Sequence, residues 1–410
     1  MPEELKAKIL ETAQEKGRTF AARENWRWHL LFDRDRGLYG DRPGNPWRMR
    51  TRQWIERFVV IEDKAAHLGR MTLNPAQRKL LADIYRMIRA NVPVHLIILK
   101  ARQIGFSTFI QALAEREMLT RSNFKARLMA HLDDTSKEIF EKVGLMSSRI
   151  AKDQSGESFW QFDMPQNSAG AIKFGPPIFS AMRVDSAQKK RPAHGTTAQL
   201  FHGSEVALWP NAEQTIKGVG PILPSTPDTF YFDESTADGD SGFFRDKFWA
   251  AWKRVQAGAR PGDGNVWAAF FPWFNAPEYR WSRVHGRPLP PELAAEIEAS
   301  LETEESWLLE QPAFERKVGW RTVDYDQIAW RRWMLANKCG REAPLDFFHE
   351  QYPGRPEHAF LASGRPFFDH ERLGALRDLV REPVWIGDLV PAGPEKTPDE
   401  LVPWMLLEKT

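Results

Sequence analysis

The stretch LIILKARQIGFST, residues 96–108, decides the fold of this chain. Its apolar part begins two residues earlier, in VHLIILK from Val94, and a nearly continuous apolar run of this length is typical of a strand buried on both faces of a parallel sheet. The segment from Ser107 to Leu119 then has the apolar spacing of a helix. A strand, a glycine-containing turn and a helix in this order form the framework of a phosphate-binding loop.

The loop departs from the usual pattern, G-x-x-x-x-G-K-[ST], in the position of its lysine. When Gly105 is aligned with the second glycine, Phe106 stands at the usual lysine position and Lys100 at that of the first glycine. The Lys100 side chain is long enough to fold back over the same phosphates, with Arg102 as a second cation. Ser107 falls on the position of the magnesium-binding hydroxyl. This stretch alone leaves open an ordinary strand-turn-helix in which the glycine only permits a tight turn.

Composition narrows the class of protein. The chain has 410 residues, 42% of them apolar, which is enough for two or three domains with a sizeable core. The single cysteine, Cys339, excludes a disulfide framework or a multi-cysteine zinc site within one chain and indicates a reducing cytoplasm. With a formal net charge of +2, any nucleic-acid surface must be a local patch. The apolar runs are far shorter than a membrane span, so no membrane partner is expected.

Strand and helix patterns alternate on both sides of the loop, which predicts a parallel α/β core. Helices are expected in residues 73–91 and 133–146, and strands in 58–62, 126–131, 179–184, 198–203, 229–235 and 266–273. From Pro272 onward helical patterns dominate, in residues 290–301, 303–311 and 324–337. We therefore expect a helical and irregular leader in 1–70, an ATPase-type core in 71–271, a helical lid or joining subdomain in 272–375 and a linker in 376–410.

Four motifs in order resemble those of the large terminase subunits of tailed phages, the ATPases that pump DNA into procapsids. KARQIGFST resembles their deviant Walker A motif, and LNPAQRKLL, upstream, their adenine-side Q motif. LFHGSEVALWP resembles their Walker B stretch and FYFDESTADGDSGFFRDKFW their coupling motif. FPWFNAPEY, IAWRRWML and FFHEQYPGRPEHAFLASGRPFFD are similar to the segments that join ATPase and nuclease. The resemblance covers roughly Phe58 to Asp369.

The resemblance implies a P-loop NTPase of the additional-strand, catalytic-glutamate type, with a mainly parallel central sheet and a small helical lid. It implies an ATP-hydrolysing motor that uses ATP and Mg²⁺ to move double-stranded DNA into a procapsid. The partners would be the DNA, the portal protein and the small terminase subunit, with a homo-oligomeric ring, a pentamer, on the procapsid. The location would be the host cytoplasm and, transiently, the portal vertex.

Each motif gives residues a role. The carboxamide of Gln77 has a donor and an acceptor, which suits an adenine edge. Glu205, at the end of its strand, can polarise the attacking water. Where the common Asp-Glu pair has its aspartate this chain has Ser204, so Ser107, waters and Ser204 would have to share the magnesium shell. Glu205 is also a candidate metal ligand. The basic loop KKRPAHG can hold an arginine finger, a DNA contact or only solvated charge, and Arg191 is the candidate finger or phosphate sensor.

The hydroxyls of Ser235 and Thr236 end the next strand and can sense the γ-phosphate, although turn capping would use the same groups. The catalytic set is Glu205, Lys100 and Arg191, and the metal set is Ser107 and Glu205. Nucleotide contacts are expected from Gln77, Lys100, Arg102, Gln103, Gly105, Phe106, Ser107, Thr108, Ser235 and Thr236.

Two other classes share some of these features. A helicase-like translocase would have the same loop and glutamate but should carry a second RecA-like domain, and no second alternating block follows Pro272. A non-enzymatic assembly protein would not need Lys100, Ser107 and Glu205 together. Terminases usually continue into a metal-dependent nuclease, whereas the carboxylates Asp369 and Glu371 lie in the joining segment. We therefore expect ATPase activity without DNA cleavage, from an ATPase-only subunit or the N-terminal part of a longer chain.

Overall fold

The computed structural model describes most of the chain between residues 51 and 360. The described residues are 51–63, 66–121, 123–149, 166–168, 170–175, 179–188, 197–227, 229–264, 266–315, 319–340 and 343–360. The chain divides into two units, Met1–Ser363 and Gly364–Thr410, and all described residues belong to the first. The candidate Arg191 and the carboxylates of Asp369 and Glu371 lie outside the described residues.

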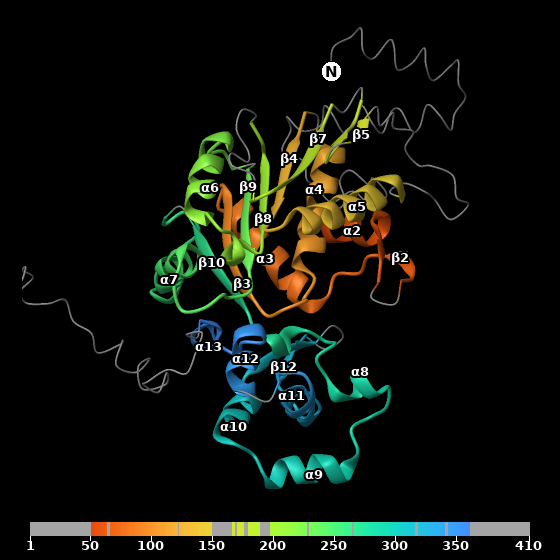
Figure 1. The fold of residues 1–410 in the computed structure, drawn as a ribbon, viewed down its shortest axis with the longest axis vertical. Helices are drawn as coiled ribbons and strands as arrows, with labels where there is room; N and C mark the ends of the chain where they lie inside the picture. The colour runs from red at the N-terminus through yellow and green to blue at the C-terminus, as the bar shows by residue number, and fades with distance from the viewer. Residues whose placement is uncertain are drawn as a thin grey trace, which may run out of the picture. The chain divides into compact units, whose positions relative to one another are not determined.

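An eight-stranded sheet forms the centre of the fold (Figure 1). Its order is β10-β3-β9-β8-β4-β7-β6-β5, and the first six strands pair in parallel, while β6 and β5 pair antiparallel at one edge. The strands are β3 (Val94–Lys100), β4 (Lys125–Ala130), β5 (Gln166–Ser168), β6 (Ala171–Lys173), β7 (Ala181–Ser186), β8 (Leu200–Ser204), β9 (Phe230–Ser235) and β10 (Trp267–Phe271).

Strand β9 separates the loop strand β3 from β8, the strand that leads to Glu205. This is the arrangement expected for the additional-strand, catalytic-glutamate type of P-loop NTPase, so the predicted fold class is confirmed. Two details differ from the sequence prediction. The strand expected at 58–62 is β1 (Val60–Glu62), which pairs with β2 (Leu68–Arg70) in a separate sheet, and the short edge strands β5 and β6 had no signal in the sequence.

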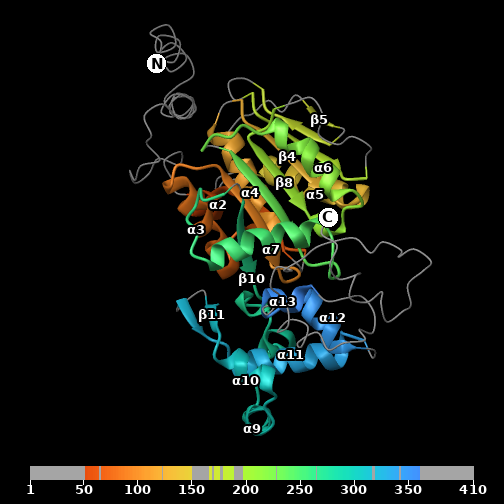
Figure 2. The same ribbon diagram turned by 90° about the vertical axis from the view of Figure 1, so that its left-hand side faces the viewer.

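Helices cover both faces of the sheet. Figure 1 shows α6 (Ala212–Val219) and α7 (Phe243–Gln256) on one side and α4 (Phe106–Thr120) and α5 (Asp133–Arg149) on the other, and Figure 2 shows α7 in front of the strands. Alternate residues of β3 pack against the helices on opposite faces of the sheet. Leu96 and Ile98 pack in the core that includes α4 and α5, and Ile97 and Leu99 in the one that includes α6 and α7. Burial on both faces is therefore the reason for the continuous apolar run.

Helix α3 (Pro75–Arg89) begins as the sequence predicts. The Gln77 N–H donates to the Asn74 side chain at 2.9 Å, and the Asn74 N–H donates to the Gln77 Oε1 at 2.9 Å. This reciprocal capping satisfies two of the donors that a helix start leaves without partners, and Pro75 fits the first turn because it needs none. The cap fixes where α3 begins, next to the phosphate-binding loop.

Beyond β10 the described residues are mainly helical. The elements there are α8 (Trp281–His285), α9 (Pro291–Ala299), α10 (Thr303–Leu309), β11 (Pro312–Glu315), β12 (Gly319–Thr322), α11 (Tyr325–Asn337), α12 (Pro344–Gln351) and α13 (Pro356–Ala359). The two strands pair only with each other, antiparallel. The remaining elements near the N-terminal end of the described chain are α2 (Thr51–Phe58) and the β1–β2 pair.

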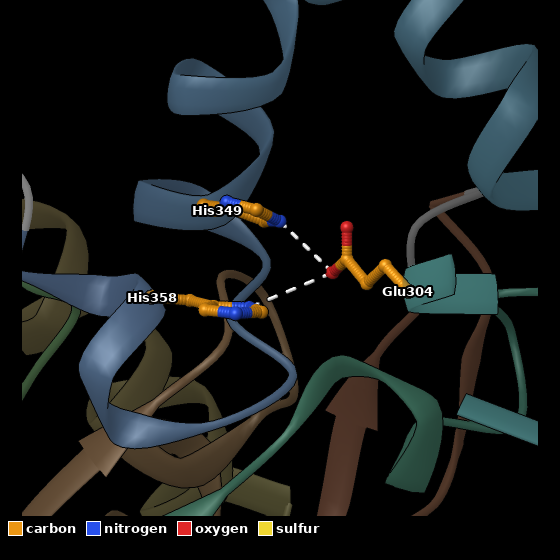
Figure 3. A group of neighbouring side chains, drawn as sticks. All are labelled: Glu304, His349 and His358. Carbon is orange, nitrogen blue, oxygen red and sulfur yellow. Dashed lines mark hydrogen bonds and ion pairs between the residues drawn. The ribbon is translucent and has the colours of Figure 1, made fainter. Parts of the chain in front are cut away.

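A polar cluster joins these helices (Figure 3). Glu304 on α10 lies 2.9 Å from the His349 Nε2 on α12 and 3.6 Å from the His358 Nδ1 on α13, and Arg331 on α11 bonds its other oxygen. Arg355 donates to the His358 Nε2. A neutral His358 must then carry its proton on Nδ1, the nitrogen nearer Glu304. Neither ring nitrogen is then a free acceptor for a metal ion, so the cluster fits a network of hydrogen bonds and ion pairs better than a metal site. Burial lowers the pKa of His358 to about 3, so the ring is neutral.

No helix among the described residues is both long and apolar enough to cross a membrane.

Glu115 makes the stability of the fold depend on pH. It is fully buried on α4, and burial raises its pKa to about 8, with Ser147 acting in the opposite direction. Between the ordinary value of 4.5 and about 8 the folded chain keeps a proton that the unfolded chain releases, so this group makes stability fall as pH rises. Glu115→Gln should remove this pH dependence. Its free energy of unfolding, relative to that of wild type, should therefore increase through that window by at most about 1.4 kcal/mol per pH unit.

Urea unfolding of both proteins at several pH values checks this prediction. Glu141→Gln, at an exposed position of α5, is the matched control and should follow wild type. If the free energies of unfolding of wild type and Glu115→Gln changed equally with pH, Glu115 would not be protonated in the folded chain.

Candidate active site

Three parallel strands end at the same edge of the sheet and carry the site. In their register Leu99 lies beside Ser235 and Ser204 beside Glu234. β3 ends at Lys100 and continues into the phosphate-binding loop, and β8 ends at Ser204, directly before Glu205. Because parallel strands present their carboxyl ends together, residues about 100 apart in sequence meet here, as in other open α/β sheets.

The phosphate-binding loop connects β3 to α4. Gly105 has φ +78°, a left-handed conformation that favours glycine, and a Cβ atom there would lie 2.9 Å from the Gln77 Nε2. The first intrahelical bond of α4 runs from the Phe109 N–H to the Gly105 oxygen at 3.1 Å. The N–H groups of residues 106–108 come before it and have no partner within the helix. These amides and the helix dipole form the type of site that binds phosphate.

Lys100 lies between two carboxylates. Its Nζ donates to the Glu205 Oε1 at 2.9 Å, and only 4% of the residue is exposed. Burial alone would lower the pKa of Lys100, but the charges of Glu205 and Glu234 raise it, so the ammonium form is maintained. Lys100 therefore lies beside Glu205 at the edge where the strands end, and its contact with phosphate stays a prediction.

Glu205 is held at both carboxylate oxygens. While Oε1 meets Lys100, Oε2 accepts from the Thr236 N–H at 3.1 Å, the Thr236 hydroxyl at 3.2 Å and the Ser235 hydroxyl at 3.3 Å. Glu205 also has φ +55°, an uncommon conformation for a residue with a side chain. Backbone strain of about 1–3 kcal/mol is typically retained at functional sites. The proposed sensor hydroxyls thus contact the proposed base directly.

Glu234 is a site residue that the sequence analysis missed. It is fully buried on β9, and its Oε1 accepts from the Ser107 hydroxyl, lies 3.3 Å from the Ser204 hydroxyl and 3.3 Å from the His202 Nε2. Burial would raise its pKa, but Lys100, His202 and Ser107 lower it to about 2, so the group is ionised.

A signal for Glu234 was present in the alternation of TFYFDES. Phe230 and Phe232 pack in the core that includes α4, and Glu234 follows them at the same two-residue spacing. Asp233, between them, lies toward α7, where it bonds Lys247. A carboxylate that ends an apolar face of a central strand, on the side of the loop helix, is a candidate for function.

The oxygen atoms near Ser107 are suited to Mg²⁺, which prefers oxygen ligands. The carboxylate in contact with Ser107 is that of Glu234, whereas the oxygens of Glu205 meet Lys100, Ser235 and Thr236. Ser204, the residue that replaces the common aspartate, lies 3.4 Å from the Ser107 hydroxyl. The metal roles of Ser107 and of Glu205 both stay predictions.

Three further residues predicted to contact nucleotide, Gln77, Gln103 and Thr108, lie at or beside the loop. Both ends of the Gln77 carboxamide are used: Oε1 accepts from Asn74 and Nε2 donates to the Gly105 oxygen at 2.6 Å. In the structure Gln77 thus supports the loop, and its contact with adenine stays a prediction, since one N–H and one lone pair of the carboxamide remain beyond these two bonds. Gln103 is exposed with φ +55°, and Thr108 is half-buried in the first turn of α4.

Arg102 connects the loop to the helical part of the chain. Its N–H donates to the Gln351 oxygen at 2.9 Å, its guanidinium to the Gln351 Oε1 at 3.2 Å, and its oxygen accepts from the Tyr279 hydroxyl. The side chain is exposed and lies at the loop. A contact of Arg102 with nucleotide remains a prediction.

Phe106 contributes no side chain to the site. It is 1% exposed, and its ring meets the Phe271 ring edge-on at 4.5 Å between centroids. Only its backbone N–H, in the first turn of α4, can meet phosphate. The usual lysine position of the loop therefore faces the core in this chain, which explains why the lysine is elsewhere.

No protein-family model and no curated protein matches the sequence. The fold is similar to solved structures of phage large terminases. That of bacteriophage HK97 is 15% identical over 63% of this chain and 53% of its own, with a TM-score of 0.43. The ATPase domain of the Thermus phage P74-26 enzyme is 21% identical over 51% of this chain and 84% of its own, with a TM-score of 0.31.

A third structure, the large terminase of a thermophilic bacteriophage in complex with ATP-gamma-S, is 10% identical over 57% of this chain and 51% of its own, with a TM-score of 0.36. This chain thus spans about half the length of the HK97 chain and of the thermophilic phage chain.

The placement of Phe106 predicts the effect of restoring the ordinary lysine. Phe106→Lys should destabilise the fold by several kcal/mol, because the new ammonium group would be buried beside Phe271. It should not restore ATP turnover to Lys100→Ala, since position 106 does not face Glu205. Urea unfolding and ATPase rates of the single and double variants measure both effects. Phe106→Leu, an apolar control, should cost less stability, and a stable, active double variant would contradict this assignment.

Proposed function

We propose that this chain is the ATPase motor of phage DNA packaging and couples ATP hydrolysis to translocation of double-stranded DNA into a procapsid. The observation that carries the proposal is the Lys100–Glu205 pair beside the loop amides, on strands separated by β9. The ordered motifs of the sequence, which resemble those of terminase large subunits, support the choice of DNA packaging over other ATPase functions. Portal protein and small terminase subunit are the further partners, and a pentameric ring on the procapsid is the working assembly, in the host cytoplasm.

The proposed chemistry follows from the groups at the sheet edge. The amides of residues 106–108 and Lys100 bind the phosphates, and Glu205 orients and polarises the attacking water. Mg²⁺, held through Ser107, supplies charge neutralisation at the phosphates when bound. When Lys100 turns to the phosphates it releases one oxygen of Glu205, and the other stays with Ser235 and Thr236. Those two hydroxyls can thereby register whether nucleotide is present.

Coupling to the helical part is supported by the anchoring of the loop. Arg102 is bonded through both its backbone N–H and its oxygen, to Gln351 and Tyr279. A shift of the loop on nucleotide binding would have to move these partners or break their bonds. The helical residues after β10 are thus suited to respond to the state of the nucleotide, as a lid in a motor must.

The alternative function is a helicase-like translocase that is not involved in packaging. Such an enzyme would pair this core with a second RecA-like sheet. In the described residues after Phe271, the strands β11 and β12 form only an antiparallel pair. The ordered motifs that resemble those of terminase large subunits favour the packaging motor. ATPase rates with and without DNA, followed by DNA packaging into matching procapsids, test the proposal, and DNA-stimulated ATPase activity with duplex unwinding but no packaging would support the alternative.

Two substitutions separate nucleotide binding from chemistry. Glu205→Gln keeps the size of the side chain and one acceptor oxygen but removes the base, so ATP binding should persist while turnover falls on the order of 100-fold or more. Lys100→Ala should weaken binding itself, because the cation at the phosphates is lost. Fluorescent-nucleotide binding and phosphate release measure the two steps. If Glu205→Gln hydrolyses ATP at the wild-type rate, Glu205 is not the base.

A further inference from the structure

We propose that Glu234 on β9 supplies the acidic ligand for the Mg²⁺ of the nucleotide complex, bound directly or through one water, in place of the aspartate that β8 lacks. This inference rests on the proposed ATP-binding function. It moves the metal-binding carboxylate from the strand of the catalytic glutamate to its neighbour, and it divides the chemistry between two glutamates on two strands.

The first support is the spacing of three oxygen atoms. The Glu234 Oε1 contacts the Ser107 hydroxyl and lies 3.3 Å from that of Ser204, and the two hydroxyls are 3.4 Å apart. Adjacent oxygen ligands of an octahedral Mg²⁺, at about 2.0–2.1 Å from the ion, lie about 3 Å from each other. The distances from the Ser204 hydroxyl to the other two oxygens are close to this spacing, and the contact between Glu234 and Ser107 places all three oxygens where one ion could reach them.

The second support is a carboxylate oxygen that the protein leaves without a partner. Glu234 is fully buried, and its Oε2 has no hydrogen-bond partner among the residues that the structure describes. Burying an ionised group without complete pairing is costly. Lys100, a cation close to Glu234, already donates to Glu205 and is also expected to move to the phosphates. A divalent cation would satisfy the oxygen that remains.

The other acidic groups at this edge are engaged elsewhere. Both oxygens of Glu205 are bonded, one to Lys100 and the other to Ser235 and Thr236. Asp233 is one residue from Glu234 but is directed to the opposite face of the sheet, where it pairs with Lys247. Among these three carboxylates, Glu234 is the one in contact with Ser107, the hydroxyl of the loop that is placed for magnesium.

A purely structural role is the competing explanation, in which Glu234 only holds Ser107 and His202 in position. The two roles differ in what they do to metal dependence. A metal ligand contributes to the affinity for the Mg²⁺–nucleotide complex and not to the affinity for metal-free nucleotide. A structural acceptor would affect both affinities alike, since it shapes the loop regardless of the metal.

The test is the dissociation constant of the full chain for ATP-gamma-S, measured in excess Mg²⁺ and in EDTA. For wild type, Mg²⁺ should tighten binding. For Glu234→Gln this tightening should shrink by on the order of 10- to 100-fold, while the constant in EDTA stays the same or improves, because a negative charge near the phosphates is gone. Glu205→Gln, which tests the competing assignment of the metal to Glu205, should keep the tightening. Mn²⁺ in place of Mg²⁺ allows the bound ion to be observed directly by electron paramagnetic resonance.

The outcomes separate the inference from the function on which it rests. Equal weakening of Glu234→Gln in Mg²⁺ and EDTA, or loss of the tightening in Glu205→Gln alone, would overturn the role of Glu234 while leaving the nucleotide site intact. Failure of wild type to bind ATP-gamma-S under either condition would overturn the proposed function and this inference with it.

Two further variants extend the test, and the first of them, Glu234→Asp, covers the case in which Glu234→Gln does not fold. Glu234→Asp keeps the buried charge but withdraws the carboxylate from Ser107, and it should show an intermediate loss of the Mg²⁺ effect. Adding Ser204→Asp to Glu234→Gln returns an aspartate to β8 and should restore the effect. Wild-type metal dependence in Glu234→Asp, together with no restoration by Ser204→Asp, would rule out the metal role.

Discussion

Parallel pairing of β3, β9 and β8 is the constraint on which the site depends. It brings the ends of three strands to one edge of the sheet in a fixed register, with Leu99 beside Ser235 and Glu234 beside Ser204. Because side chains alternate along a strand, the same register decides which groups face α4 and which face α7. A shift of one residue in β9 would exchange Glu234 for a neighbour on the face of the loop helix and remove the carboxylate from Ser107.

The electrostatics of the site follow from that arrangement. One ammonium group, Lys100, lies with two carboxylates, of which Glu234 is buried and Glu205 half-buried. Without ligand these three side chains carry a net charge of −1, which opposes the binding of phosphates, while the loop amides and the helix dipole favour it. In the proposed complex a divalent cation that enters with the phosphates would reverse this balance. The pairing of Lys100 with Glu205 therefore fits a resting state that a metal–nucleotide complex rearranges, and a neutral cleft would give no such dependence.

The displaced lysine also has a packing reason. In the ordinary loop the lysine follows the second glycine, but here that position is buried in the core, against Phe271 at the end of β10. Lys100 instead ends β3 and reaches the site from the strand. The loop between Lys100 and Phe106 is held by Arg102, whose backbone is bonded to Gln351 and Tyr279 of the helical part. Strand, loop and helical part are thus connected through neighbouring backbone positions.

The sequence by itself determined the local features of this protein. The apolar run before Lys100, the helical pattern of residues 73–91 and the alternation of strands and helices predict elements whose causes are within a few residues, and these predictions are confirmed. Only the tertiary structure decided which side chains meet. Gln77 is directed to the loop by its cap, Phe106 to the core, and Glu234 to Ser107 more than a hundred residues away. Such contacts depend on strand order and register, which are set by packing across the whole sheet, so no local pattern could contain them.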